Sequence, residues 1–138
     1  MEAVKITVEA KVNASIQKVW DCWTNPKLIV KWNFANDEWC CPSAENDLRL
    51  GGKFTSRMEA KDGSFGFDFG GVYTEVKTHE LISYTMEDGR KAEVHFKEEN
   101  DQTTVTEIFD AENQNSVELQ KAGWQAILNN FKKCAEAQ

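Results

Sequence analysis

The sequence has no apolar run close to the roughly 20 residues that a membrane-spanning helix requires, so we expect no transmembrane segment. Met1 and Glu2 lack the basic and apolar regions that open a signal peptide, which predicts a soluble, cytoplasmic protein. Internal repeats, linkers and low-complexity tracts are also missing. A chain of 138 residues can bury one sizeable core, and we therefore expect one domain over residues 1–138.

Clusters of basic residues are missing too. The net charge is -7, and the 16 lysines and arginines are scattered along the chain. Affinity for nucleic acid comes mainly from basic residues that release counterions from phosphates, and anionic membrane surfaces attract basic patches in a similar way. We expect neither nucleic acid nor a membrane surface as a partner.

Cysteine spacings typical of metal sites do not occur. The four cysteines form no Cys-x-x-Cys pair, and none has His or Arg beside it to lower its pKa: Cys22, Cys40, Cys41 and Cys134. Adjacent side chains in a strand point to opposite faces, so Cys40 and Cys41 are a poor start for a zinc site. Buried or half-buried free thiols of a reducing compartment are expected, with no metal and no cofactor.

Periodic apolar residues are what the chain does contain. An alternating pattern predicts an opening strand whose buried face carries Val4, Ile6 and Val8. Asn13 or Ser15 can cap a short helix, whose apolar face would hold Ile16, Val19, Trp20 and Trp23. Pro26 can begin a second short helix, with Leu28, Ile29 and Trp32 as its apolar residues.

Turn signals then divide the middle of the chain into strands. They predict six further antiparallel strands, at Cys41–Leu50, Lys53–Lys61, Phe65–Val76, Leu81–Met86, Ala92–Glu98 and Thr103–Asp110. A long helix closes the chain, with Asn115 as its expected N-cap and Glu118 at N3. A curved sheet around that helix would bury the apolar stripe of the helix, which gives an α+β fold.

Several motifs in this order resemble the START-like superfamily, also called SRPBCC or helix-grip proteins. The closer resemblance is to the branch related to the activator of the ninety-kilodalton heat-shock protein ATPase. It is carried by Val19-Trp20-x-x-Trp23-Thr24-Asn25-Pro26, Asp47-Leu48-Arg49-x-Gly51-Gly52-x-Phe54, Gly71-Val72-Tyr73-Thr74-Glu75-Val76, Thr106-Glu107-x-Phe109-Asp110 and Gly123-Trp124-x-x-Ile127-Leu128. The resemblance implies a helix-grip fold: a curved seven-stranded antiparallel sheet wrapped around a long C-terminal helix, with two short helices after the first strand and a cavity inside.

Two features depart from this pattern. Many relatives follow the first tryptophan after the short helices with a second one and Gly-Pro, whereas this chain reads Trp32-Asn33-Phe34-Ala35. Co-chaperone members also carry a separate client-binding domain that this chain does not supply, which argues against a chaperone partner.

Each residue near the expected cavity has two possible roles, one in ligand contact and one in packing. Trp32, Phe34 and Trp39 either present apolar ring faces and indole N–H groups to a ligand or fill the core. Alternation places Phe65, Phe67, Phe69 and Tyr73 on one strand face; packing and curvature explain them first, with a bulge expected near Gly70–Gly71 and ligand contact second. Arg57 and Tyr84 can bring one charge and one hydroxyl near the cavity.

Glu107 and Gly123 each suggest a specific functional hypothesis: proton transfer for Glu107 and an opened cavity for Gly123. If Glu107 shares a buried face with Val105 and Phe109, desolvation raises its pKa and suits it to proton transfer; we favour the opposite face as buried and Glu107 as solvated. Gly123 costs roughly 1 kcal/mol in a helix relative to alanine. Close packing beside Trp124 is the simpler explanation, and a cavity opened by the missing side chain is the alternative.

No catalytic set is recognisable, since His79 lies in a turn and His95 on a solvated face. We therefore expect a non-catalytic domain, monomeric or homodimeric, that binds a small apolar or aromatic molecule. Its expected contact residues are Trp32, Phe34, Phe67, Tyr73, Tyr84, Glu107, Gly123 and Trp124. The alternatives are a cyclase- or hydrolase-type enzyme that uses Glu107 or a tyrosine, and a stress-related or chaperone-associated interaction module with an exposed apolar patch.

Overall fold

The computed structural model describes residues 4–138, and Met1 and Glu2, in which no signal-peptide pattern was found, lie outside this range. The seven strands form one antiparallel sheet in the order β1-β7-β6-β5-β4-β3-β2. They are β1 (Lys5–Val12), β2 (Trp39–Asn46), β3 (Lys53–Ala60), β4 (Gly66–Lys77), β5 (Leu81–Met86), β6 (Lys91–Glu99) and β7 (Gln102–Asp110). The helices are α1 (Ile16–Thr24), α2 (Pro26–Ile29) and α3 (Val117–Glu136).

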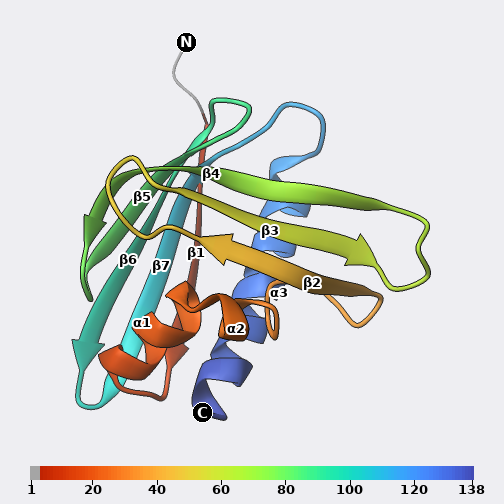
Figure 1. Cartoon of the computed structure of the whole chain (residues 1–138). Coiled ribbons are helices and arrows are strands. Elements are labelled where there is room, and N and C mark those ends of the chain that lie inside the picture. The colour runs from red at the N-terminus through yellow and green to blue at the C-terminus, as the bar shows by residue number, and fades with distance from the viewer. Residues whose placement is uncertain (1–3) are drawn as a thin grey trace.

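The sheet curls around α3, and α1 and α2 cover one end (Figure 1). Its β2–β3–β4 part crosses the part made of β1, β7, β6 and β5 at a steep angle, so the inner faces of both parts turn toward the helix (Figure 1). The predicted α+β helix-grip fold is confirmed. No helix in residues 4–138 is long and apolar enough to cross a membrane.

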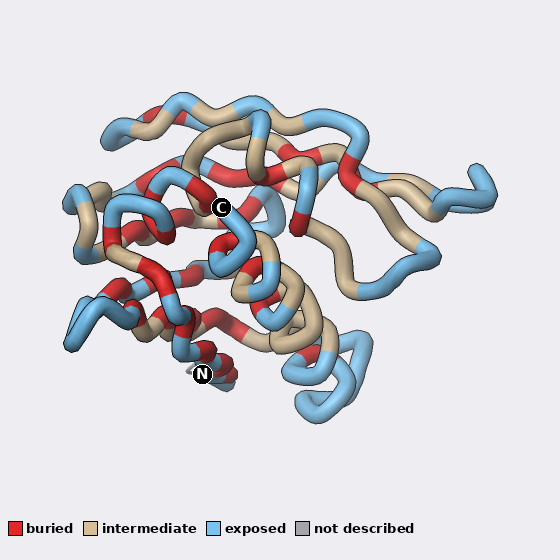
Figure 2. The backbone as a smooth tube through the Cα atoms, turned by 90° about the horizontal axis from the view of Figure 1, so that it is seen from below, coloured by how far each residue is buried: buried red, intermediate tan, exposed pale blue. Residues whose placement is uncertain are grey.

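Alternation decides which side of each strand is buried. β1 buries Ile6, Val8, Ala10 and Val12, whereas Val4, expected on the same face, is 59% exposed because it precedes the first paired residue, Lys5. Figure 2 shows buried and exposed residues alternating along the strands. The innermost apolar side chains come from α1, the sheet and α3, and they include Val19, Val94, Phe109, Leu128 and Phe131.

A bulge in β4 helps to bend the sheet. Tyr73 pairs with Tyr84 and Glu75 pairs with Ser83, so Thr74 is the extra residue. The bulge expected near Gly70–Gly71 is therefore wrong by three positions. The two glycines serve close backbone approach instead: a Cβ on either would lie 2.5 Å from a backbone oxygen, of Phe54 for Gly70 and of Thr85 for Gly71.

Local capping sets two further boundaries. Ser15 caps α1, since its side chain accepts a hydrogen bond from the Lys18 N–H. At α3 the expected cap Asn115 is wrong: Ser116 has the extended backbone of an N-cap and its Oγ accepts from the Leu119 N–H at 3.1 Å. Asn115 is held outside the helix by Glu112, whose carboxylate accepts from its backbone and side-chain N–H groups.

The predicted strand Cys41–Leu50 is four residues too long at its end. After Asn46 the chain turns, with backbone hydrogen bonds from Arg49 to Asp47 and from Gly52 to Arg49. The Arg49 Nε lies 2.9 Å from the Asp47 carboxylate, which confirms the ion pair expected to support this turn. Gly51 has a φ of 79°, a conformation that glycine adopts without strain.

Candidate functional site

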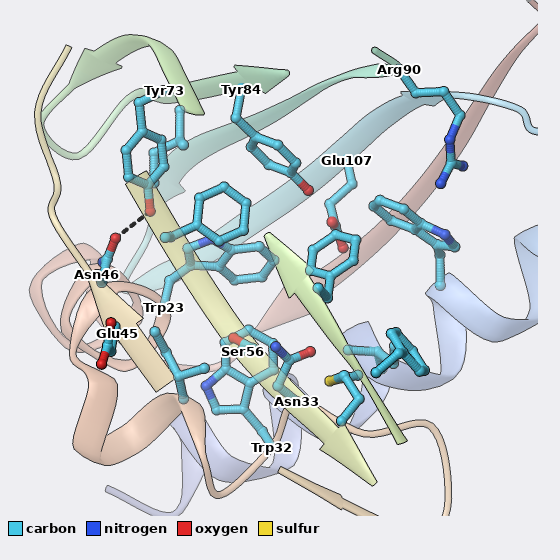
Figure 3. A pocket seen from close by; sticks show the side chains of 18 of the residues that line it. Trp23, Trp32, Asn33, Glu45, Asn46, Ser56, Tyr73, Tyr84, Arg90 and Glu107 are labelled. Atoms are coloured by element: carbon cyan, nitrogen blue, oxygen red, sulfur yellow. Dashed lines mark hydrogen bonds between the residues drawn. The ribbon is translucent and has the colours of Figure 1, made fainter. Parts of the chain in front are cut away.

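A pocket of about 340 Å³ lies between the inner face of the sheet, α3 and the segment of the short helices. Its wall is mainly apolar in surface and includes eight aromatic side chains: Trp23, Trp32, Phe54, Phe67, Phe69, Tyr73, Tyr84 and Trp124. Polar side chains from different elements also line the pocket, as Figure 3 shows for Asn33, Ser56, Arg90 and Glu107. Six of the eight expected contact residues line this pocket, namely Trp32, Phe67, Tyr73, Tyr84, Glu107 and Trp124, whereas Phe34 and Gly123 do not.

Trp32 forms the wall beside the short helices. Its side chain is buried, and its ring lies 5.0 Å from that of Trp23 and 4.9 Å from that of Phe131. The indole N–H donates to the backbone oxygen of Cys22 at 2.8 Å, so it is already paired. The expectation of a free indole donor is wrong: Trp32 offers the pocket an apolar ring surface, and it packs in the core as well.

Phe34 does not line the pocket, which corrects its expected role. Its backbone N–H donates to the Trp32 oxygen at 2.7 Å in a tight turn, and its side chain is not among those that form the wall. Asn33 lines the pocket in its place. From α3, Asn130 donates to the backbone oxygen of Trp32 at 2.8 Å and holds the turn against the helix.

β4 supplies Phe67, Phe69 and Tyr73 to the same wall, as the alternation predicted. Phe67 is 40% exposed and lies at the rim, where its ring contacts that of Trp39. Tyr73 is buried, and its hydroxyl donates to Oδ1 of Asn46 (Figure 3). The Asn46 amide in turn donates to the Thr24 oxygen at 2.7 Å, so β4, β2 and α1 are joined at this side of the pocket.

Helix α3 contributes Trp124 to the pocket wall and has unfilled space beside Gly123. Trp124 lines the pocket and stacks on Phe109, with ring centroids 3.7 Å apart. A Cβ built on Gly123 would meet nothing within 4 Å, which contradicts close packing as the reason for this glycine. Gln120 and Ile127 line the pocket, and Gly123 lies on the same helix face, half-buried, but is not itself part of the pocket wall.

Glu107 is the largest correction to the sequence-based expectations. Its face of β7 is the inner one, shared with Val105 and Phe109, and the residue is only 4% exposed instead of solvated. Burial raises the pKa of its carboxyl to about 8. This rise in pKa favours the protonated, neutral carboxyl at neutral pH.

Tyr84 belongs to the same buried region. Figure 3 shows its hydroxyl and the Glu107 carboxyl directed into the same part of the pocket. Burial raises the pKa of Tyr84 well above its ordinary value, and the neighbouring charge of Glu107 adds to this rise. The site can thus donate hydrogen bonds from two neutral groups inside an apolar surrounding.

Arg90 is a pocket residue that sequence reasoning missed. It lines the pocket while Arg57, the arginine considered from the sequence, lies on the other strand face and pairs with Glu59 and Asp68. The Arg90 Nε is 2.7 Å from the Asp88 carboxylate. No periodicity points to Arg90, because its position depends on how the β5–β6 turn folds over the sheet. Phe54, which the sequence analysis also missed, could have been predicted, because it alternates with the pocket residues Ser56 and Met58 along β3.

No cysteine or histidine of the described residues lines this pocket. Cys22 and Cys41 are buried and Cys40 and Cys134 half-buried, all as free thiols. The Sγ atoms of Cys22 and Cys134 are 3.7 Å apart, which is a contact and not a bond. His95 is exposed and lies 3.0 Å from the Glu93 carboxylate.

The chain was compared with known families and proteins. The model of the family described as Activator of Hsp90 ATPase homolog 1-like protein matches residues 13–136. None of the curated proteins matches the chain significantly.

Solved structures are similar over nearly the whole chain. The AHSA1-like protein from Aeromonas hydrophila has 44% identity and a TM-score of 0.91, over 97% of this chain and 93% of that one. Chr148 from Cytophaga hutchinsonii has 55% identity and a TM-score of 0.83, over 96% and 92% of the two chains. Protein NE0264 from Nitrosomonas europaea, at 18% identity and a TM-score of 0.81 over 97% and 95%, shares the fold.

The family match spans most of the sequence, and two solved relatives share its fold at 44% and 55% identity. This chain belongs to the AHSA1-like family, within the START-like (SRPBCC) proteins.

Proposed function

We propose that this chain binds a small apolar or aromatic molecule between the sheet and α3. The observation that carries the proposal is the aromatic-walled pocket of about 340 Å³, a volume within the range of roughly 300–1,000 Å³ typical of small-molecule sites. Eight aromatic side chains line it, and a ligand covering them would remove a large apolar surface from water.

The wall is held in place before any ligand arrives. The Trp32 indole is fixed by the Cys22 oxygen, and the Tyr73 hydroxyl by Asn46. Trp124 is fixed by its stack on Phe109. Side chains that are already ordered lose little conformational entropy on binding, which favours affinity.

A ligand screen by thermal shift, followed by native mass spectrometry of the hits, tests this proposal. The matched variants are Gly123→Leu, which places a side chain in the open space of α3, and Ala122→Leu on the exposed face of the same helix. We expect Gly123→Leu to weaken binding of the hits at least tenfold and Ala122→Leu to leave it unchanged. Equal affinities for the two variants would place the ligand elsewhere and contradict the proposal.

A second candidate function is proton transfer to or from a bound ligand. Glu107 favours it, because a buried carboxyl with a pKa of about 8 exchanges its proton near neutral pH. The test is deuterium uptake from D₂O into carbon positions of a bound ligand, followed by mass spectrometry. Uptake that is lost in Glu107→Gln while affinity remains supports an enzyme, and a ligand recovered unchanged supports binding alone.

A further inference from the structure

Glu107 and Tyr84 occupy adjacent rows of the inner face of the sheet. In one row Tyr84 pairs with Ala92, which pairs with Phe109. In the next row Ile82 pairs with Val94, which pairs with Glu107. Because Ala92 is small, the two long polar side chains extend over the β6 strand between them into the same part of the pocket (Figure 3).

Neither polar group is satisfied by the protein. Within residues 4–138, no hydrogen bond reaches the Glu107 carboxyl or the Tyr84 hydroxyl, and the two do not bond each other. Yet every fully enclosed side-chain nitrogen or oxygen in this range has a partner. The unpaired oxygens of Glu107 and Tyr84 must therefore border open space, and both residues line the pocket.

The charged and titratable surroundings decide which ligand group fits this space. Within the described chain, Glu107 is flanked on its own face by apolar residues of the neighbouring strands, Val8 on β1 and Val94 on β6, and the facing pocket side chains of α3 carry no charge. The titratable or charged groups that line the pocket around it are Tyr84 from β5, Tyr73 from β4, Arg90 from the β5–β6 turn, Glu112 from the β7–α3 loop and Glu45 from β2. Glu45 is exposed and Glu112 is half-buried, with its carboxylate bonded to Asn115.

We propose that Tyr84 and Glu107 form a two-donor anchor for the carbonyl oxygen of an otherwise apolar, aromatic ligand. This inference rests on the proposed function and names the ligand class. One oxygen can accept from the Tyr84 hydroxyl and from the protonated Glu107 carboxyl at the same time, because a carbonyl carries two lone pairs. A carboxyl kept neutral by an apolar site is able to donate in this way.

A cationic amine fits the same space less well. It requires Glu107 to ionise while buried, with no hydrogen bonds from the described residues to stabilise the anion. It also leaves the Tyr84 hydroxyl without an acceptor on the ligand and brings a second positive charge toward Arg90. A carbonyl satisfies both donors and creates no buried charge.

The test uses three probes that share one bicyclic body: 2-acetylnaphthalene, 2-ethylnaphthalene and 1-(2-naphthyl)ethylamine. Their dissociation constants are measured by tryptophan fluorescence at pH 6. We expect the acetyl compound to bind about 10- to 100-fold more tightly than the ethyl compound, since two hydrogen bonds are gained. The infrared carbonyl band of the bound acetyl compound should move to lower wavenumber.

Variants identify the donors. Tyr84→Phe should lose about tenfold in affinity for the acetyl compound and little for the ethyl compound. Wild-type affinity for the acetyl compound should fall about tenfold or more between pH 6 and pH 9.5 as Glu107 ionises. Glu107→Gln keeps an N–H donor, so it should retain the preference and lose the pH dependence. Glu93→Gln on the outer face of the sheet should change neither.

The outcomes separate the inference from the proposed function. Equal binding of the acetyl and ethyl compounds overturns the carbonyl anchor and leaves an apolar binding pocket. Tightest binding of the amine, abolished in Glu107→Gln, overturns it in favour of a cation site. Binding of none of the three overturns the proposed function in this size class and the anchor with it.

Discussion

Trp124 stacks on Phe109 with ring centroids 3.7 Å apart and an angle of 11° between the ring planes. The stack joins α3 to β7 at the place where the core ends and the pocket begins. Phe109 is fully buried, whereas Trp124 is half-buried and lines the pocket. One contact between a helix and a strand thus contributes to both stability and the shape of the site.

Trp124→Ala should reduce the free energy of unfolding by about 2–3 kcal/mol, less than for a fully buried tryptophan because one side of the ring faces the pocket. Urea unfolding monitored by circular dichroism measures it. Leu119→Ala on the same helix is the control: Leu119 is 60% exposed, and its loss should stay within about 0.5 kcal/mol. Equal effects of the two variants would contradict the stacking role.

Glu107 should make the protein less stable as the pH rises. Its folded pKa of about 8 lies above the ordinary value of 4.5, so the folded state holds a proton that the unfolded chain has released. Stability from this group is complete below pH 4.5 and is lost as the pH rises to 8, at about 1.4 kcal/mol per unit of pKa difference.

Urea unfolding of the wild type and of Glu107→Gln at pH 5 and pH 8.5 tests this linkage. We expect the wild type to lose several kcal/mol relative to the variant between the two pH values, because the amide cannot ionise. The carboxyls with lowered pKa values, such as Asp110 and Glu136, are present in both proteins and cancel in this comparison. Identical pH profiles would show that Glu107 does not titrate in this range.

Gly123→Ala should stabilise the protein by about 0.5–1 kcal/mol, because alanine favours the helix and its Cβ meets nothing within 4 Å. Gly70→Ala is the opposite case, since its Cβ would lie 2.5 Å from the Phe54 oxygen, and we expect a loss of about 2 kcal/mol. Thermal unfolding of both variants checks the pair. Destabilisation by Gly123→Ala would restore close packing as the reason for this glycine.

Tyr73→Phe should cost about 1–2 kcal/mol, because it leaves the Asn46 Oδ1 without its hydroxyl donor beside the pocket. A double-mutant cycle with Asn46→Ala isolates the pair. We expect a coupling energy of about 1 kcal/mol in urea unfolding. Additive effects would show that the hydroxyl and the amide act independently.

The four thiols should differ in reactivity. Burial raises the pKa of the Cys41 thiol to about 11 and that of Cys22 further, so both are poor nucleophiles in the folded protein. With an aromatic disulfide reagent at pH 8 we expect Cys40 and Cys134, which are half-buried, to react first. All four should react at similar rates in urea, and fast labelling of Cys22 in the native protein would contradict its burial.

Periodicity and turn signals were sufficient for the architecture. Alternation in β1 and β6 and the apolar stripe of α3 are local patterns that report which side of an element is buried, and they identified all seven strands and the long helix. Motifs such as Val19-Trp20-x-x-Trp23 indicated the AHSA1-like family. Errors at this level were small, such as Asn115 for Ser116 as a cap, where two neighbouring polar residues suit the position equally well.

Local sequence patterns thus define the strands, the helices and the aromatic residues available to line the pocket. Which side chains face the pocket depends on how the elements pack together. β7 has two plausible faces, and the packing of α3 on the sheet buries Glu107 with Val105 and Phe109. The bulge at Thr74, the position of Arg90 and the open space at Gly123 likewise depend on how distant segments meet. A strand pattern records alternation, but the side that becomes the interior is set by the element that packs against it.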